Sequence, residues 1–377
     1  KCWQKCKRMA LTSPRARGSS QNPSRPIDAT LDFGVFGLFL SYFSYASDFS
    51  LREKTELDNV STGVIKDIET IGDTIYIASE NGVFEFVGGT ASKLNYKSSS
   101  ATSGLISDIH YDPDGFLWIV EYSVGVFRLD LNSHISEQVF TEVTEASDSW
   151  AIEMSEDHVI LSVINGILLF QKETLSQVDW LSDLGPGKLL NVYSLALTIN
   201  GAFLVSSHNR FLSITPNEQN VEVYSIEEHF PELNYVTSVF SIDEDNFFAG
   251  DTGMYTWSLE NSTPNFIDYS HDLTITAPIE DIHKTANGEL WVAAGGVYRL
   301  TEHKITSMPF MNPVLTSDDI KNVAVIDSIS SGEVLIASSQ LGLIAITEGH
   351  KSVNLMHHKN DMFPCLKLPI NILKFKK

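Results

Sequence analysis

The sequence predicts an all-β protein, a seven-bladed β-propeller made of four-stranded antiparallel blades. A short apolar phrase recurs seven times at intervals of 41 to 44 residues, and each copy is followed by a turn and further apolar strands. A fixed period of this length filled with short strands is typical of propellers, in which each repeat forms one blade. Aligned on its fourth residue, the phrase falls at Ile68, Ile109, Ile152, Leu195, Val239, Ile282 and Val323.

The four strands of a blade are plainest in the second repeat. Alternating apolar residues between turn residues predict strands over Leu105–Tyr111, Phe116–Glu121, Val126–Asp130 and Ile135–Phe140. In the other blades, third strands are expected to begin at Val83, Ile167, Phe211, Met254, Val297 and Leu343, with outer strands near Leu94, Val178, Val223, Phe266, Ile305 and Val353. Residues 351–356 can supply the outer strand of the last blade, and Phe49–Glu53 can lie against it. No helix is expected between residues 60 and 350.

Glycine marks the second hairpin of six blades. These residues are Gly82, Gly125, Gly166, Gly253, Gly296 and Gly342. A tight hairpin needs positive φ at this point, which glycine adopts without a steric cost.

Trp118 and Trp291 occupy equivalent positions in the second strands of two blades. We expect both to pack between blades.

Composition divides the chain into four parts. They are a basic leader with a signal peptide (1–46), a linker (47–59), the propeller (60–357) and a short basic tail that we interpret as a truncation point (358–377). The apolar run Phe33–Phe43 follows basic residues and ends in Ser44-Tyr-Ala46, which predicts cleavage after Ala46 and a periplasmic location. Whether residues 1–25 and 358–377 are native stays open.

The charge of the central region excludes one class of partner. Residues 47–349 carry 13 basic and 45 acidic side chains. A field of that sign repels phosphate backbones, so we expect no nucleic-acid binding. Membrane contact is expected only through a span downstream of this chain.

No motif in the sequence indicates catalysis or a cofactor. It contains no Gly-x-Ser-x-Gly elbow, His-Glu-x-x-His pair or phosphate-binding glycine loop. Asp112-Pro-Asp-Gly115 resembles the start of a calcium loop, but Ser123 stands where the closing glutamate is needed, so a β-turn is the better interpretation. We therefore predict a chain that is not an enzyme, with no catalytic residue, cofactor or metal.

The repeat phrase resembles a known family. Ile106-Ser-Asp-Ile109 with Leu117-Trp-Ile119, and Ile279-Glu-Asp-Ile282 with Leu290-Trp-Val292, are similar to the two-component regulator propeller repeat. This resemblance implies the periplasmic ligand-sensing region of a bacterial hybrid histidine kinase or diguanylate cyclase, with a homodimer in the intact receptor as one arrangement. The chain departs from the family pattern in having one ring's worth of repeats and no output domain before Lys377.

Two alternatives of other classes remain open. A lactonase-like or lyase-like propeller enzyme would hold a metal at the mouth of the channel, and Asp67, Asp108 and Asp281 would be its ligands if there were one. The same aspartate belongs to the repeat phrase, which favours a structural role. The other alternative is a periplasmic protein-interaction scaffold.

The ligand-binding face is expected where loops enter the innermost strands. These loops supply Trp150, Tyr193, Tyr235 and His229, and nearby turns supply Tyr122 and His208. Aromatic residues among acids suit a sugar, a peptide or a cationic ligand better than an anionic one. For each aromatic residue, simple packing of its loop is an equally good explanation.

Overall fold

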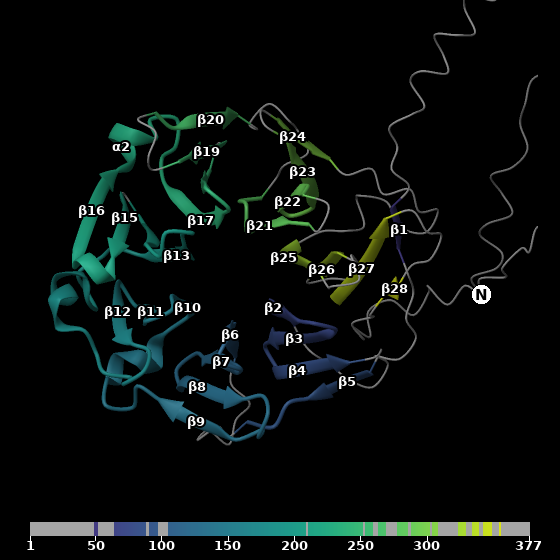
Figure 1. Ribbon diagram of the computed structural model, residues 1–377. Helices are drawn as coiled ribbons and strands as arrows, with labels where there is room; N and C mark the ends of the chain where they lie inside the picture. Colours follow the sequence, from purple (N-terminus) through teal and green to yellow (C-terminus); the bar gives the residue numbers. More distant parts are fainter. Residues whose placement is uncertain are drawn as a thin grey trace, which may run out of the picture. The chain divides into compact units, whose positions relative to one another are not determined.

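In the computed structural model (Figure 1), all described residues belong to one unit, Ser47–Lys377. The structure describes residues 49–51, 64–87, 90–96, 105–208, 210–251, 253–258, 263–268, 277–285, 288–301, 304–307, 323–328, 334–338, 342–348 and 354–355. The leader, most of the linker and the tail lie outside these residues, so the signal peptide and the domain boundaries stay predictions.

The described strands form seven separate antiparallel sheets, one for each repeat. The first two contain β2 (Ile65–Ile71), β3 (Thr74–Ser79), β4 (Gly82–Val87) and β5 (Thr90–Lys93), then β6 (Ile106–Asp112), β7 (Phe116–Glu121), β8 (Gly125–Asp130) and β9 (Ser136–Val139). The third and fourth contain β10 (Ala151–Met154), β11 (His158–Val163) and β12 (Gly166–Gln171), then β13 (Val192–Leu197), β14 (Phe203–Ser207), β15 (Arg210–Thr215) and β16 (Asn220–Ser225).

The remaining three sheets follow the same order. They contain β17 (Val236–Ile242), β18 (Asp245–Gly250), β19 (Gly253–Trp257) and β20 (Asn265–Asp268), then β21 (Asp281–Lys284), β22 (Leu290–Ala293), β23 (Val297–Thr301) and β24 (Lys304–Ser307). The last contains β25 (Val323–Ser328), β26 (Val334–Ser338) and β27 (Gly342–Glu348), to which β1 (Phe49–Leu51) and β28 (Asn354–Leu355) are added.

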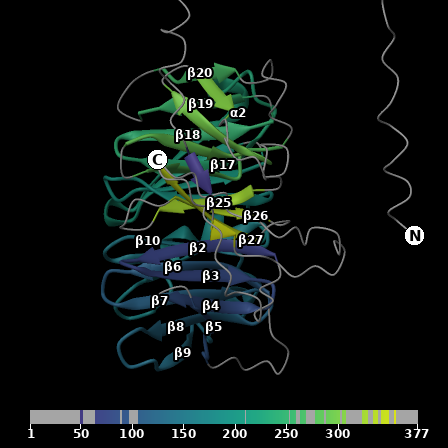
Figure 2. The same ribbon diagram turned by 90° about the vertical axis from the view of Figure 1, so that its right-hand side faces the viewer.

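The fold is an all-β propeller of four-stranded antiparallel blades, as predicted. Among the described residues, six of the seven sheets have at least four strands, whereas the third has three and an isolated bridge between Phe170 and Gln177. The first strand of each sheet contacts the first strand of the next, and β25 contacts β2. Figure 1 shows these strands innermost, and the side view of Figure 2 shows β2 to β5 and β6 to β9 in sequence order.

Both ends of the described chain contribute to the last sheet. Strand β1 pairs with β27 through Phe49 opposite Glu348 and Leu51 opposite Ile346. Strand β28 pairs with the same edge through Ile344 opposite Leu355. An edge strand left unpaired is a site for aggregation, so this pairing protects the end of the repeat array.

One predicted position in the last repeat is wrong. Ile326, not Val323, pairs with the second strand as Ile68 does in the first repeat. The fourth residue of the phrase therefore recurs 44 residues after Ile282. Residues 323–326 are all apolar, so the alternation alone did not distinguish the two registers.

The expectation of no helix is also wrong. A single turn, α2 (Ile226–His229), and three 3-10 segments, η2 (Thr144–Asp148), η3 (Asp179–Leu184) and η4 (Pro216–Glu218), lie between strands. The turn of α2 is fixed by packing, because Ile226 and Phe230 at its ends are fully buried. Among the described residues, none of the helices has the length and apolar character of a membrane span.

The core lies between neighbouring sheets. Trp118 is fully buried and belongs to an apolar cluster that joins the second sheet to residues of the third, such as Met154 and Phe170. Trp291 is also buried. At the second hairpins, Gly82 and Gly125 have positive φ as predicted, but the prediction is wrong for Gly166, Gly253 and Gly296; at Gly166 a Cβ would lie 2.3 Å from the Gly185 carbonyl oxygen. Close approach of backbone therefore explains that glycine.

Candidate functional site

The innermost strands share an irregularity near their first residue. Five of them contain a bulge, in which one extra residue interrupts the pairing with the second strand: Lys66, Ser107, Tyr193, Thr237 and Ala324. Trp150 and Glu280 are the equivalents in the other two sheets, where their N–H groups bond to the Ser162 and Ala293 carbonyls. We call these seven residues the bulge positions. A bulge turns a side chain away from the sheet, which is why bulges are common beside binding sites.

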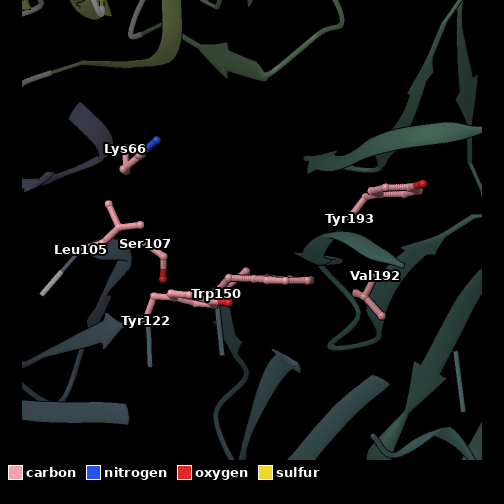
Figure 3. A pocket seen from close by; sticks show the side chains of 8 residues that line it. Lys66, Leu105, Ser107, Tyr122, Trp150, Val192 and Tyr193 are labelled. Atoms are coloured by element: carbon pink, nitrogen blue, oxygen red, sulfur yellow. The ribbon is translucent and has the colours of Figure 1, made fainter. Parts of the chain in front are cut away.

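Four of the bulge positions line a cavity of about 500 Å³. Lys66, Ser107, Trp150 and Tyr193 come from four successive sheets, and Leu105, Tyr122, Ala151 and Val192 complete the lining. We call this space the mouth cavity. In Figure 3 the lining residues of the first two sheets and those of the fourth lie on opposite sides of the view, with Trp150 extending between them.

The mouth cavity offers aromatic faces and one cation. Tyr193 is 40% exposed and Trp150 is half-buried, so parts of both rings remain accessible. The Tyr193 hydroxyl lies 3.3 Å from His208 Nδ1 and accepts a hydrogen bond from Asn191 Nδ2 at 3.4 Å, which orients the ring. Lys66 is exposed, and it interacts electrostatically with the Glu280 carboxylate.

The structure brings together some of the aromatic residues predicted to bind a ligand. Tyr122, Trp150 and Tyr193 line the mouth cavity, and His208 contacts it through Tyr193. Tyr235 is not among the lining residues. Neither is His229, whose ring stacks on Trp257 with centroids 5.8 Å apart and whose Nδ1 lies 3.0 Å from the Ser225 carbonyl oxygen. Packing of the loop therefore accounts for His229.

Sequence reasoning missed Lys66 and Ser107. Each immediately precedes the aspartate of its repeat phrase, and the residue at this position differs in chemistry from repeat to repeat. A variable position inside a repeated phrase was the available signal. Regular strand alternation assigns that side chain to one face of the sheet, so the pattern does not place it in a cavity.

The aspartates proposed as metal ligands instead join neighbouring innermost strands. Asp67 Oδ2 accepts the Ile109 N–H at 3.1 Å, and Asp108 Oδ2 accepts the Ile152 N–H at 2.8 Å. Asp281 Oδ2 likewise accepts the Ile326 N–H at 2.7 Å. These residues occupy the third position of the phrase, which we call the junction position. The bonds explain why the aspartate belongs to the repeat.

Serine takes this role in the fourth and fifth sheets. The Ser194 hydroxyl lies 3.3 Å from both the N–H and the carbonyl oxygen of Val239, and the Ser238 hydroxyl donates to the Ile279 carbonyl oxygen at 2.8 Å. The other two junction positions hold Ala151 and Val325, whose side chains have no polar atom. These two junctions therefore have no side-chain hydrogen bond between their innermost strands, and at the fifth junction Ser238 donates to a carbonyl oxygen instead of accepting an N–H.

Burial changes the acidity of the junction carboxyls. It raises the pKa of Asp281 to about 7 and, despite the hydrogen bonds it receives, the pKa of Asp67 also lies above its ordinary value. Burial, with the neighbouring Asp67 carboxyl, holds the pKa of Asp108 well above its ordinary range. Among the described residues, no group of three or more His, Cys, Asp or Glu side chains is arranged to hold a metal ion.

A second polar row lies two residues further along the same strands. His110 is placed between two acids, with Nδ1 3.7 Å from Glu69 Oε1 and Nε2 3.7 Å from Glu153 Oε1. His283 Nδ1 lies 3.8 Å from Asp327 Oδ1. Burial raises the pKa of Glu69 to about 7 and lowers that of His283 to about 4. The centre of the ring thus favours uncharged forms of its titratable groups.

Comparisons with known proteins agree with this architecture. No family model and no curated protein matches the chain. Among solved structures it is similar to the extracellular domain of a protein described as a hybrid two-component system from B. thetaiotaomicron, with TM-score 0.62, 14% identity and coverage of 79% of this chain and 39% of that one. The fold is that of this domain. The agreement is consistent with the resemblance of the repeat phrase.

Other similar structures have different functions. A streptogramin B lyase gives TM-score 0.63 at 14% identity and is covered completely, against 81% of this chain. A virginiamycin B lyase from Staphylococcus aureus gives TM-score 0.59 at 16% identity, with 80% and 99% covered. At such identities the similarity shows a common fold and leaves function to the residues of the site.

Proposed function

We propose that this chain is an extracytoplasmic ligand-sensing propeller module of a bacterial signal-transduction receptor, closed as a ring of seven blades. In this proposal the chain is exported, a signal peptide is removed after Ala46, and the response comes from a separate output domain. The module binds its ligand without turning it over.

The mouth cavity is the observation that carries the proposal. Its lining comes from four successive sheets, and three aromatic side chains, Tyr122, Trp150 and Tyr193, contribute to it. Small-molecule sites are typically concave, mostly apolar and supplied with a few placed polar groups. Here Lys66 and Ser107 are those polar groups. A sugar ring or a short peptide fits this combination of flat faces and polar atoms.

The seven-bladed ring is supported by the contacts between innermost strands. Each first strand touches the next, from β2 through β25 and back to β2. The third sheet, with three described strands, is the incomplete one. In that sheet, the isolated bridge between Phe170 and Gln177 lies where a fourth strand would pair.

A ligand screen tests the proposal. The purified chain is heated with a panel of oligosaccharides and short peptides, and the thermal midpoint is recorded. A ligand should raise the midpoint of the wild type and of Thr237→Ala, a bulge position outside the cavity, but not that of Trp150→Ala or Tyr193→Ala. Equal stabilisation of all four proteins would contradict binding at the mouth cavity.

Catalysis at the same cavity is the second candidate. Two lyases that the chain covers along 100% and 99% of their length show that other proteins of this fold are enzymes. The two candidates differ in one measurement, because an enzyme converts a bound ligand. Mass spectrometry of the ligand recovered after prolonged incubation with the protein distinguishes them, and a changed mass would overturn the sensing proposal.

A further inference from the structure

The mouth cavity lies at one of the two junctions that lack the hydrogen bond between innermost strands. Ala151 occupies the junction position of the third sheet and lines the cavity. None of the polar junction residues lines it; these are Asp67, Asp108, Ser194, Ser238 and Asp281. The cavity and the missing bond therefore occur together. A side chain of aspartate size at position 151 would project into the same space.

The missing bond has a definite donor. At four other junctions the acceptor receives the N–H of the phrase's fourth residue in the next sheet: Ile109, Ile152, Val239 and Ile326. The counterpart in the fourth sheet is Leu195, which pairs with Val205 in the register in which Ile109 pairs with Ile119. Ala151 has no side-chain oxygen to offer this N–H group. Leu195 is half-buried, so a ligand group that offers its N–H an acceptor binds there at an advantage.

We propose that Ala151 creates the binding site of the mouth cavity, and that a ligand carboxylate takes the place of the missing junction side chain by accepting the Leu195 N–H. This inference rests on the proposed function and names the ligand group recognised. At the preceding junction the Asp108 carboxylate holds the Ile152 N–H in the same way, so the protein itself supplies the geometry of the contact.

Two further features of the cavity suit a carboxylate on a small ligand. Lys66 is the one charged residue in its lining, and it is positive. Trp150 directly precedes Ala151 in the chain and Tyr193 comes from the next sheet; both line the cavity, so they provide apolar faces for the rest of the molecule. The terminus of a peptide and an acidic sugar both present this chemistry.

Acetate is the probe, because it is the side chain of aspartate as a free molecule. Protein labelled with 15N-leucine is titrated with sodium acetate at constant ionic strength, with sodium chloride as the balancing salt. The Leu195 amide resonance is assigned with Leu195→Met. We expect a saturable shift of this resonance in the wild type, and a rise in thermal midpoint that chloride does not produce.

Ala151→Asp should abolish both effects, because its own carboxylate occupies the site, and acetate affinity should fall at least tenfold. Ala151→Ser is the conservative companion: its hydroxyl can reach Leu195 as Ser194 reaches Val239, and it should weaken the acetate response even if the aspartate variant does not fold. Thr237→Ala should respond as the wild type does. The proposal is overturned if acetate does not shift the Leu195 amide resonance of the wild type. It is also overturned if both Ala151 variants respond to acetate as the wild type does.

The outcome separates this inference from the proposed function. If a sugar or peptide binds in a manner that depends on Trp150 and Tyr193 but leaves the Leu195 amide unmoved, sensing stands and the role of Ala151 is rejected. If acetate moves the Leu195 amide while no sugar or peptide stabilises the protein, the role of Ala151 stands and sensing is rejected. Comparing N-acetylphenylalanine with glucuronate then distinguishes a peptide terminus from an acidic sugar.

Discussion

Asp67 and Asp108 lie on neighbouring innermost strands, and Asp67 Oδ2 accepts the N–H of Ile109, the residue next to Asp108, at 3.1 Å. Asp108 Oδ2 in turn accepts the Ile152 N–H of the third sheet at 2.8 Å. Three successive sheets are thus connected through two side chains. Burial raises the pKa of both carboxyls, and the neighbouring Asp67 carboxyl raises that of Asp108 further.

Stability should fall as the pH rises from about 4 to 7. Burial raises the pKa of Asp281 to about 7, whereas the unfolded chain loses this proton near 3.8. The folded state binds more protons in that window, so a higher pH favours unfolding, by at most about 4 kcal/mol for this group. Glu69 acts in the same sense. His283, with its pKa lowered to about 4, opposes both below pH 6.5.

Urea unfolding at pH 5, 6, 7 and 8 measures this dependence. The matched variant is Asp281→Asn, whose amide oxygen still accepts the Ile326 N–H but cannot ionise. Its free energy of unfolding should decline less with pH than that of the wild type. Parallel curves for the two proteins would show that Asp281 keeps an ordinary pKa.

Trp118→Ala should destabilise the protein by about 3–5 kcal/mol, as buried large-to-small changes do. The indole is fully buried between the second and third sheets, and its Nε1 lies 3.4 Å from Asp112 Oδ2. Tyr193→Ala removes a side chain that is 40% exposed, so it should cost less than about 1 kcal/mol while removing ligand binding. Chemical denaturation of both variants gives the comparison, and the reverse order of stability would place the binding face elsewhere.

Ser238→Ala should cost about 1 kcal/mol, the usual contribution of one hydrogen bond. The hydroxyl is buried and donates to the Ile279 carbonyl oxygen at 2.8 Å, which joins the fifth and sixth sheets. The control is Ser147→Ala, which removes an exposed hydroxyl bonded to Thr144 within one 3-10 segment. If the two variants are equally stable, the junction bond adds nothing to the ring.

Removal of the residues before Arg52 should lower the thermal midpoint and promote self-association. Strand β1 covers part of one edge of β27, and the short β28 covers only two residues of that edge. An exposed edge pairs readily with another chain. Size-exclusion chromatography and thermal unfolding of proteins that begin at Ser47 and at Arg52 test this, and identical behaviour would show that β28 alone protects the edge.

Much of the fold could be predicted because the same pattern of apolar strands and turn residues recurs along the chain. Every predicted third strand begins within one residue of its observed start, since a glycine or its equivalent marks the hairpin. The fourth strands are less regular because they lie outermost and bury one face at most. The error at Val323 arose where consecutive apolar residues hide the alternation. The turn of α2 escaped prediction because tertiary packing of Phe230, not helix propensity, fixes it.

The site could be predicted only in part. Of the aromatic residues predicted in the entry loops, Trp150 and Tyr193 line the mouth cavity, and Tyr193 does so at a bulge in its strand. Sequence patterns carry no marker for a bulge, so Lys66 and Ser107 were missed. The junction aspartates could be assigned to the repeat, but the hydrogen bonds that make them structural depend on the spacing of neighbouring sheets.

The pairing of Phe49 with Glu348 also constrains the order of events in folding. These two residues are about 300 positions apart, so this contact forms only after nearly the whole repeat array is available. Contacts between such distant segments are slow to form because a long loop must close first. During synthesis, the earliest strand therefore remains without its partner the longest. Ring closure is expected as the final and slowest step, and the interval before it is when the chain most needs protection by a chaperone.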